Sequence, residues 1–219
     1  MPHLKSTIEF HVPEPTLRRL PWYLAFAKLA LQQGESFLSS TRIAKSIAVD
    51  ASMVAKDLSF VKISGRTRVG YDVNELIAVL EHFLGFTDSH QAYLFGVGNL
   101  GGALMHDNGL QQFGMEIKAG FDVKQELTGT SINHIPIHHI DKFTELQQQT
   151  GIHIGILTVP VNKAQEVSDI MVKGGIKAIW NFTPYRIVVP ENVIVQNTSI
   201  YAHLAVMYNR LNALKELDL

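Results

Sequence analysis

Residues 91–102, which read QAYLFGVGNLGG, constrain the fold of this chain more than any other stretch. A short apolar run at 93–95 leads directly into the pattern Gly96-x-Gly98-x-x-Gly101. In such a pattern the first glycine allows a tight turn, the second lets backbone approach a pyrophosphate, and the third lets the next helix pack closely. Backbone N–H groups at the start of that helix then hold the phosphates. The pattern therefore predicts the first strand and helix of a dinucleotide-binding domain.

A second strand at the expected distance strengthens this prediction. Residues 115–122 read MEIKAGFD and end in Asp122, about 20 residues beyond the glycines. An acid at this position accepts hydrogen bonds from a ribose diol. The alternative is a glycine turn in an ordinary α/β domain, with Asp122 as a loop acid.

Strands and helices alternate in the rest of this region. We expect strands at 135–140, 152–159, 176–182 and 193–196, with helices at 141–150 and 162–173 between them. This alternation predicts a parallel sheet, and ligands of such sheets bind at the carboxyl ends of the strands. Two of those ends read Thr158-Val159-Pro160 and Asn181-Phe182-Thr183. A terminal helix over 197–217 then places an apolar stripe on one face: Leu204, Met207, Leu211 and Leu214.

The first 85 residues show a different pattern. Apolar spacing predicts a helix at 15–33, two short helices at 40–47 and 51–60, and a further helix at 72–84. The two short helices form a helix-turn-helix arrangement. Residues 61–71 are expected to form two strands about a tip that contains Arg66 and Arg68, and such a wing offers both arginines to a phosphate backbone or minor groove. The alternative is a set of short helices that never touches DNA.

The charge distribution favours a polyanionic partner for this front part. The chain has a net charge of −1, but its first 70 residues contain ten basic and five acidic side chains, so the remainder is strongly acidic. There is no cysteine, which excludes thiolate chemistry and disulfides. No apolar run approaches the roughly 18 residues of a membrane span, and residues 1–15 lack the apolar core of a signal peptide.

Little in the sequence indicates catalysis or a metal site. His138 and His139 would face opposite sides of a strand, so they do not readily share one metal with His134. No Ser-His-Asp order or Tyr-x-x-x-Lys pair is present, and no proton donor for hydride chemistry stands out. We therefore expect neither an enzyme nor a metalloprotein.

Motifs along nearly the whole chain, from residue 12 to about 211, resemble the Rex family of redox-sensing transcriptional repressors. They include VPEPTLRRLPWYLAFAKL, SSTRIAKSI, DLSF, FGVGNLGGAL, ILTVP, GGIKAIWNFTP and VPENV, in this order. The resemblance implies an α/β protein with an N-terminal winged-helix domain (1–85), a Rossmann-type parallel sheet binding NAD(H) (86–196) and a C-terminal dimerisation helix (197–219) swapped onto a partner. It implies a cytoplasmic homodimer that represses from palindromic double-stranded operator DNA and is released by NADH.

The resemblance also implies roles for individual residues. The cofactor would contact Gly96, Val97, Gly98, Asn99, Leu100, Gly101, Asp122, Thr158, Val159, Pro160, Asn181, Phe182 and Thr183. DNA would contact Ser40, Lys45, Ser52, Met53, Lys56, Arg66 and Arg68. The alternatives are a nicotinamide-dependent oxidoreductase with a helical appendage, and a CoA- or nucleotide-binding scaffold without DNA binding.

The sequence departs from the family pattern at several positions. Ala55 replaces one of two adjacent basic residues, and the wing gains Arg68. Ser199 replaces an aspartate that helps couple the cofactor to the DNA-binding domain, and Asp107 replaces a tyrosine. Arg19 corresponds best to the switch arginine of the family. We therefore expect either an Arg19–Asp107 pair that substitutes for the lost carboxylate, or two solvent-facing positions that have drifted.

Overall fold

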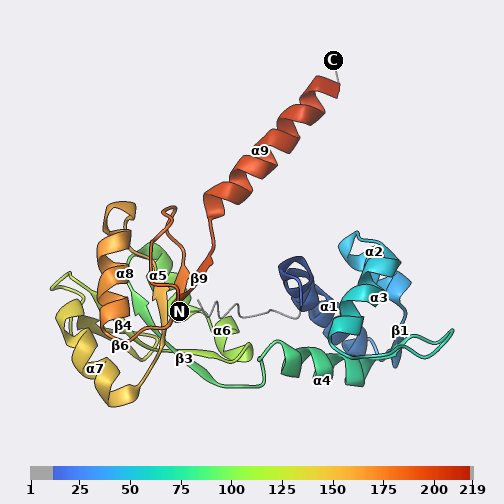
Figure 1. Ribbon diagram of the computed structural model, residues 1–219, viewed down its shortest axis with the longest axis horizontal. Helices are drawn as coiled ribbons and strands as arrows, with labels where there is room; N and C mark the ends of the chain where they lie inside the picture. Colours follow the sequence, from blue (N-terminus) through green and yellow to red (C-terminus); the bar gives the residue numbers. More distant parts are fainter. Residues whose placement is uncertain (1–11, 218–219) are drawn as a thin grey trace, which may run out of the picture. The chain divides into compact units, whose positions relative to one another are not determined.

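A computed structural model of the chain describes residues 12–217 (Figure 1). Residues 1–11 of the predicted winged-helix domain and residues 218–219 of the predicted terminal helix lie outside the described residues. The chain forms two compact units that divide between Asp88 and Ser89.

The first unit is built on one long helix whose buried face repeats every three to four residues. Leu20, Tyr23, Leu24 and Ala27 are buried on this helix and pack with Val54 and Leu58 in one core. The elements of this unit are α1 (Glu14–Gln32), β1 (Phe37–Leu38), α2 (Ser40–Ile47), α3 (Ala51–Phe60), β2 (Tyr71–Asp72) and α4 (Val73–Phe83).

The helix-turn-helix pair α2 and α3 lies where the sequence predicts it. The Ser39 hydroxyl accepts a hydrogen bond from the Arg42 N–H at 3.2 Å, which caps the start of α2. Ala48 adopts a left-handed conformation with φ of 55° and ends α2. Asp50 then precedes α3, but its side chain makes no capping hydrogen bond.

The prediction of two strands within residues 61–71 is wrong. This segment forms a single isolated bridge between Arg66 and Gly70, and the two-stranded sheet instead pairs β1 with β2. Lys62 and Arg68 have φ values of 59° and 64°, which interrupt an extended backbone. The wing is therefore a loop closed by one bridge rather than a hairpin.

The second unit contains a seven-stranded sheet in the order β5-β6-β4-β3-β7-β8-β9. All pairs are parallel except β5–β6, a short antiparallel hairpin that the sequence pattern did not reveal. Without β5 the strands follow the Rossmann order 3-2-1-4-5-6. The strands are β3 (His90–Phe95), β4 (Met115–Asp122), β5 (Ser131–Ile132), β6 (Ile135–His139), β7 (Ile154–Leu157), β8 (Ala178–Asn181) and β9 (Ile194–Asn197).

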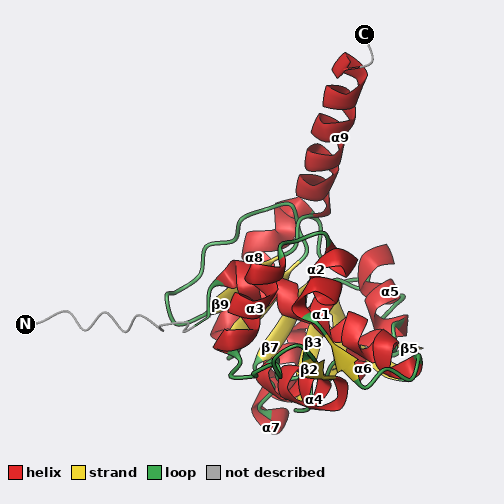
Figure 2. Ribbon diagram, turned by 90° about the vertical axis from the view of Figure 1, so that its right-hand side faces the viewer, coloured by secondary structure: helices red, strands yellow, loops and turns green. Residues whose placement is uncertain are grey.

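Helices cover both faces of this sheet, as the alternation along β3 requires (Figure 2). Tyr93 and Phe95 pack on one face with residues of α7 and α8, while Ala92 and Leu94 pack on the other with Met105 of α5. Phe95 stacks on Phe121 of β4 with ring centroids 5.2 Å apart. The helices are α5 (Asn99–His106), α6 (Gly109–Gln112), α7 (Phe143–Thr150) and α8 (Ala164–Lys173).

The terminal helix α9 (Ile200–Leu217) follows the sheet and is exposed along nearly its whole described length (Figure 1, red). Its predicted apolar stripe is present, but only Leu204 is half-buried, whereas Met207, Leu211 and Leu214 are exposed. In the part of the chain that the structure describes, no helix is long and apolar enough to cross a membrane.

Candidate functional site

The three glycines of the turn after β3 differ in what a side chain at each position would meet. Gly96 has φ of 95°, and a Cβ there would lie 2.8 Å from the Val159 side chain. A Cβ on Gly101 would lie 2.2 Å from the Gly96 carbonyl oxygen, so this glycine lets α5 pack against the turn. A Cβ on Gly98 would meet nothing within 4 Å. The turn thus has open space at Gly98, directly before the first residue of α5, where a phosphate binds in folds of this kind.

Asp122 stands at the carboxyl end of β4, beside this turn. Its Oδ2 accepts a hydrogen bond from the Val97 N–H at 2.7 Å, and its Oδ1 accepts one from the Lys124 N–H at 3.0 Å. A carboxylate has about four acceptor positions, so acceptor capacity remains on both oxygens. Asp122 also lines a cavity beside the turn. It is therefore oriented by backbone and still able to accept hydrogen bonds from a diol.

A cavity of about 530 Å³ lies at the carboxyl ends of β3, β4 and β7. Of the predicted cofactor residues, Gly96, Gly98, Asp122, Thr158, Val159 and Pro160 line it. The Thr158 hydroxyl lies 2.8 Å from the Gly96 carbonyl oxygen and so ties the end of β7 to the glycine turn. The residues present fit an adenine dinucleotide, since they combine an open phosphate cradle, a ribose acceptor and an apolar wall.

Other residues of the cavity were missed by the sequence analysis. Val123 and Lys124 follow Asp122 directly, so the position of Asp122 at the end of β4 was a usable signal for them. The remainder comes from η1 (Ile140–Lys142), η2 (Val161–Lys163) and α8, for which the sequence offered no signal: Ile140, Lys163, Glu166, Val167 and Ile170. Phe121, the residue before Asp122, also lines the cavity.

The other predicted cofactor residues do not line this cavity. Asn181 is fully buried, donates to the Tyr185 carbonyl and the Asn197 side chain, and accepts from Thr183. Phe182 lies against Trp180, with ring centroids 4.6 Å apart. Val97 is buried behind the turn, while Leu100 is 36% exposed at the start of α5. Asn99 and Gly101 belong to the same first turn of α5.

The predicted DNA-contacting residues of α3 share one exposed face. Ser52, Met53 and Lys56 are exposed, whereas Val54, Asp57 and Leu58 face the core. On α2, Ser40 is the first residue and is half-buried, and Lys45 is exposed in the last turn. The helix-turn-helix therefore offers hydroxyl, thioether and ammonium groups to solvent on one side of α3.

The cations of the first unit divide into two groups. Arg18, Arg19, Lys28 and Arg42 form salt bridges with Glu14, Asp57, Glu81 and Glu35. Among residues 12–214, no salt bridge involves Lys45, Lys56, Lys62, Arg66 or Arg68. The second group lies on the helix-turn-helix and the wing, where a polyanion would neutralise it.

The two wing arginines differ in their surroundings. The Arg66 N–H donates to the Gly70 carbonyl at 2.8 Å, and the Arg66 guanidinium lies 5.3 Å from the centre of the Phe37 ring. This is the distance of a cation–π contact. Arg68 is exposed and holds φ of 64° at the tip of the loop. Arg66 is thus held against β1, while Arg68 points its charge into solvent.

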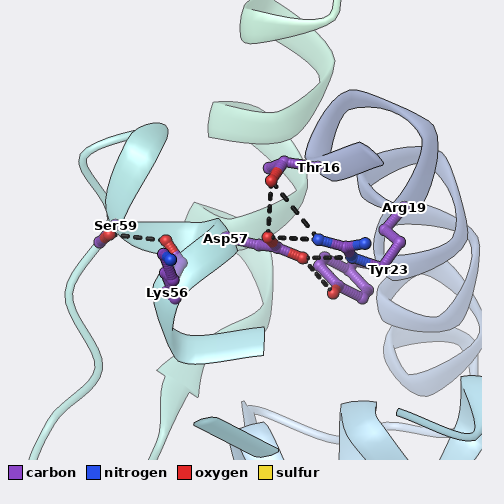
Figure 3. A network of polar contacts seen from close by, with 6 residues as sticks. All are labelled: Thr16, Arg19, Tyr23, Lys56, Asp57 and Ser59. Atoms are coloured by element: carbon purple, nitrogen blue, oxygen red, sulfur yellow. Dashed lines mark hydrogen bonds and ion pairs between the residues drawn. The ribbon is translucent and has the colours of Figure 1, made fainter. Parts of the chain in front are cut away.

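A buried carboxylate joins α3 to α1 (Figure 3). Asp57 is 2% exposed, and its two oxygens accept four hydrogen bonds from three side chains of α1. Arg19 binds it through Nε at 2.6 Å and Nη2 at 2.8 Å, Thr16 donates at 2.8 Å, and Tyr23 donates at 2.7 Å. The sequence analysis did not find this cluster, although Thr16, Arg19 and Tyr23 have the spacing of a single helix face.

Burial and hydrogen bonding oppose each other at this carboxylate. Burial is the largest influence and disfavours the charged form, but the hydrogen bonds from Arg19, Tyr23 and Thr16 together outweigh it, so the pKa of Asp57 lies below its ordinary value. Burial, and then the hydrogen bond to Asp57, raises the pKa of Tyr23 well above its ordinary value. The cluster therefore contains an ionised Asp57 and a protonated Tyr23 at neutral pH.

The three predicted switch residues each have a contact within their own unit. Arg19 is paired with Asp57 as described. Asp107 accepts a hydrogen bond from the Gly109 N–H at 2.8 Å and so shapes the turn between α5 and α6. The Ser199 hydroxyl accepts from the Ala202 N–H at 3.2 Å at the start of α9.

The three histidines at 134–139 do not gather around one point. His138 lies against Phe121, with ring centroids 6.0 Å apart, and His139 Nδ1 lies 3.1 Å from Asp141. Within the described part of the chain, no group of three histidine or acidic side chains is arranged to hold a metal ion.

Two family models match the chain, one in each unit. A model described as "Putative DNA-binding protein N-terminus" matches residues 11–59, and one described as "CoA binding domain" matches residues 87–185. The first match covers α1, α2 and nearly all of α3, and the second covers the glycine turn and the cavity.

Curated relatives are similar along nearly the whole chain. A "Redox-sensing transcriptional repressor Rex" of Bacteroides fragilis is 66% identical over 201 residues, which cover 92% of this chain and 91% of the relative. A protein of the same name from Porphyromonas gingivalis is 58% identical over 209 residues, 95% of this chain and 96% of the relative.

Solved structures agree with these relatives. A crystal structure described as RSP in complex with β-NAD+ and operator DNA superposes with a TM-score of 0.88 at 31% identity, covering 94% of this chain and 95% of that one. A structure of RSP in complex with β-NADH has a TM-score of 0.85 at the same identity, covering 94% and 97%. RSP is described as a Rex-family repressor.

Proposed function

The chain belongs to the Rex family of redox-sensing transcriptional repressors, and from this we propose that it binds a palindromic operator as a homodimer and leaves that operator when NADH occupies the cavity at Gly98. The observation that supports this most strongly is the presence in one chain of an open phosphate cradle and of a helix-turn-helix with unpaired cations. Members of this family are repressors rather than enzymes, so the cofactor acts here as a ligand that is sensed.

In this proposal NAD(H) is held mainly through its adenosine and pyrophosphate. Residues 96–101 hold the pyrophosphate, mainly through the N–H groups of residues 98–101, because those of Gly96 and Val97 already donate to the Phe121 carbonyl and to Asp122. Asp122 accepts from the adenosine ribose, and Thr158, Val159 and Pro160 line the cleft. We assign Asn181, Phe182 and Thr183 to the nicotinamide end, where Asn181 acts by shaping the loop after β8 because its own amide groups are already bonded.

DNA binding is assigned to the exposed face of α3 and to the wing. Ser52, Met53 and Lys56 would meet base edges or phosphates in the major groove, and Ser40 and Lys45 would meet the backbone. Arg66 and Arg68 would lie toward the minor groove or the neighbouring phosphates. The unpaired cations of this unit support the assignment, since phosphate contacts supply most of the affinity in such complexes.

A second copy of the chain is the proposed cover for α9. Its apolar stripe is exposed, and contiguous apolar surface on a helix marks a site of interaction with another chain. Exchange of α9 between two copies buries both stripes by the same contact, as a twofold interface requires. The protein would work in the cytoplasm, where both operator DNA and the NADH pool are found.

The switch is assigned to Arg19, Asp107 and Ser199. Asp57 uses Nε and Nη2 of Arg19, and among the described residues Nη1 has no hydrogen bond. Nη1 of Arg19 therefore remains available to a second carboxylate while Asp57 stays bound. NADH controls DNA binding only if it binds the DNA-incompetent arrangement more tightly than the competent one, and couplings of about 1–3 kcal/mol are typical.

The test is fluorescence anisotropy of a labelled palindromic promoter duplex at one stated salt concentration, repeated with NADH, NAD+ and CoA. We expect salt-dependent binding that NADH reverses and that NAD+ and CoA leave intact. Release by CoA in place of NADH would favour a CoA sensor, in keeping with the match of residues 87–185 to the CoA binding domain. Absence of sequence-specific binding, or turnover of NADH with carbonyl compounds, would contradict the repressor proposal.

Two glycine variants test whether NADH releases the operator by binding in the cavity. Gly98 has extended backbone, with φ of −85° and ψ of −161°, and open space, so Gly98→Val should fold and fill the phosphate cradle. We expect at least a 100-fold loss of NADH affinity and an operator complex that NADH no longer releases. The matched control is Gly102→Ala one turn later, whose Cβ would make an ordinary 3.6 Å contact with Ile132. It should keep NADH binding and gain up to about 1 kcal/mol of helix stability.

A further inference from the structure

The recognition helix α3 is attached to α1 by two kinds of contact with different directional properties. Val54 and Leu58 of α3 belong to the same buried apolar core as Leu20 and Leu24 of α1. Such apolar contacts are non-directional and tolerate small rotations. The contact at Asp57 is different, because a forked pair between Arg and carboxylate fixes both distance and angle.

All donors to Asp57 come from one face of α1 (Figure 3). Thr16, Arg19 and Tyr23 lie at positions i, i+3 and i+7, which places them along a single stripe. They supply four hydrogen bonds of 2.6–2.8 Å, two to each carboxylate oxygen. With about four acceptor positions, the carboxylate is saturated. Its orientation is therefore determined by α1 and not by solvent.

The neighbours of Asp57 in the sequence are the residues assigned to DNA. Lys56 precedes it, and Met53 lies one turn earlier on the exposed face. A rotation of α3 by about 20° would move side-chain atoms about 6 Å from the helix axis by roughly 2 Å. Hydrogen bonds to base edges do not survive a displacement of that size. Attraction to the phosphate backbone depends on distance less steeply.

We propose that Asp57 is a positioning residue for operator recognition: held by Arg19, Thr16 and Tyr23, it fixes the rotation of α3 on α1, so that sequence-specific affinity depends on a side chain that does not reach the DNA. This rests on the proposed function, in which α3 reads the operator. The positioning should affect sequence discrimination far more than total affinity for DNA.

The test compares binding of operator duplex and of random-sequence duplex of equal length, at a temperature well below the unfolding transition. Asp57→Asn replaces one acceptor oxygen by an NH₂ group, which cannot accept from Arg19 or Tyr23. We expect operator affinity to fall about 10- to 100-fold, as when one or two base contacts are lost, while affinity for the random duplex changes less than threefold. The dissociation constant for NADH should not change.

The matched control is Asp50→Asn. It makes the same carboxylate-to-amide change directly before α3, where the side chain is exposed and makes no capping hydrogen bond. Removing this negative charge should tighten both duplexes equally and leave their affinity ratio unchanged.

Two variants on α1 test the positioning role of Asp57 if Asp57→Asn itself does not fold. Arg19→Lys keeps the charge but lacks the fork, so it should lower the affinity ratio by an intermediate amount, and Tyr23→Phe should lower it less. An unchanged ratio in folded Asp57→Asn or in Arg19→Lys would overturn the positioning role, as would an equal loss on both duplexes. If the wild type itself shows no preference for the operator, the proposed function fails, which is a distinguishable result.

Discussion

Asp57 and Asp122 are carboxylates that the fold uses in opposite ways. Asp57 receives four hydrogen bonds from the side chains of another helix and has no acceptor capacity left. Asp122 receives one backbone hydrogen bond on each oxygen and faces a cavity. The first arrangement fixes one helix on another, whereas the second presents an oriented acceptor to a ligand.

The protonation of Asp57 leads to a prediction about stability in acid. Because its pKa is lower in the folded protein than in the unfolded chain, its contribution is fully present above about pH 4 and is lost as the pH falls through the folded-state pKa. We expect Asp57→Asn to cost about 2 kcal/mol at pH 7. The difference in unfolding midpoint from wild type should narrow below pH 4.

Thermal unfolding followed by circular dichroism between pH 7 and pH 2.5 would measure this difference. Arg19 and Tyr23 are the titratable groups that contact Asp57. Asp50 and Lys56 lie nearby, since they line one surface pocket together with Arg19 and Asp57. Asp50→Asn serves as the control for a general loss of negative charge. If the difference in unfolding midpoint between wild type and Asp57→Asn stayed constant throughout the acid range, Asp57 would not be the ionised, stabilising carboxylate that we infer.

At the scale of elements, the wing is held by one bridge and by the β1–β2 pair, and not by two paired strands of its own. Its chain closes through the bridge between Arg66 and Gly70, and a Cβ on Gly70 would lie only 2.3 Å from the Leu38 carbonyl oxygen. β2 leaves the wing and pairs with β1, which precedes α2 in the chain. The loop is thereby anchored at its base, while its tip remains exposed.

This anchoring predicts unequal roles for the two wing arginines in DNA binding. Arg68→Ala should weaken binding of any duplex about 5- to 10-fold and lower the slope of log K against log salt by about one, because one phosphate contact is lost. Arg66→Ala should affect DNA less and instead cost about 0.5–1 kcal/mol of stability, through loss of the contact with Phe37.

Salt titrations of both alanine variants, together with their unfolding midpoints, separate these effects. Arg68 has positive φ, and alanine at that position is strained to a similar degree. Arg68→Ala therefore does not change stability by relieving backbone strain, and the two alanine variants can be compared directly. A larger loss of DNA affinity for Arg66→Ala than for Arg68→Ala would show that the contact with Phe37 does not restrain Arg66 in the complex.

At the scale of the whole molecule, cofactor and DNA are assigned to different units of the chain. The cavity lies within the second unit, and the cations of the helix-turn-helix and wing that form no salt bridge lie within the first. Coupling between them therefore needs two arrangements with different affinities for NADH. The exposed helix α9 is the third part, and its apolar stripe is the surface through which we propose that two copies pair.

Disruption of that stripe should produce monomers. Met207 and Leu211 are 52% and 49% exposed and lie on the same face of α9. We expect the double substitution Met207→Glu and Leu211→Glu to convert a dimer to a monomer in size-exclusion chromatography with light scattering, because two charges would be buried in an apolar contact.

Asn209→Glu with Asn212→Glu is the matched control, since it adds the same charge to the opposite face of α9. This control should remain dimeric. A monomeric wild type, or a dimer that both pairs of substitutions leave intact, would refute dimerisation through this stripe.

The sequence by itself determined the parts of this protein that depend on local backbone and period. The glycine turn, the place of Asp122 at the end of β4, the alternation of strands and helices, and the positions of α2 and α3 could all be predicted, because a glycine turn, a strand that ends in an acid and an amphipathic helix each need particular residues at short, fixed spacing. The resemblance to a family rested on the same local motifs.

Tertiary structure alone decided which distant groups meet. The partners of Asp57 lie 34 to 41 residues away, β1 pairs across the helix-turn-helix with β2, and Lys163 and Glu166 reach a cavity that begins at Gly96. The wing also illustrates this, since its extended pattern did not form two strands once positive φ values at Lys62 and Arg68 bent the chain. The physical reason is that a hydrogen bond or salt bridge requires a distance and an angle in space, and spacing along the chain specifies these only within a single turn or element.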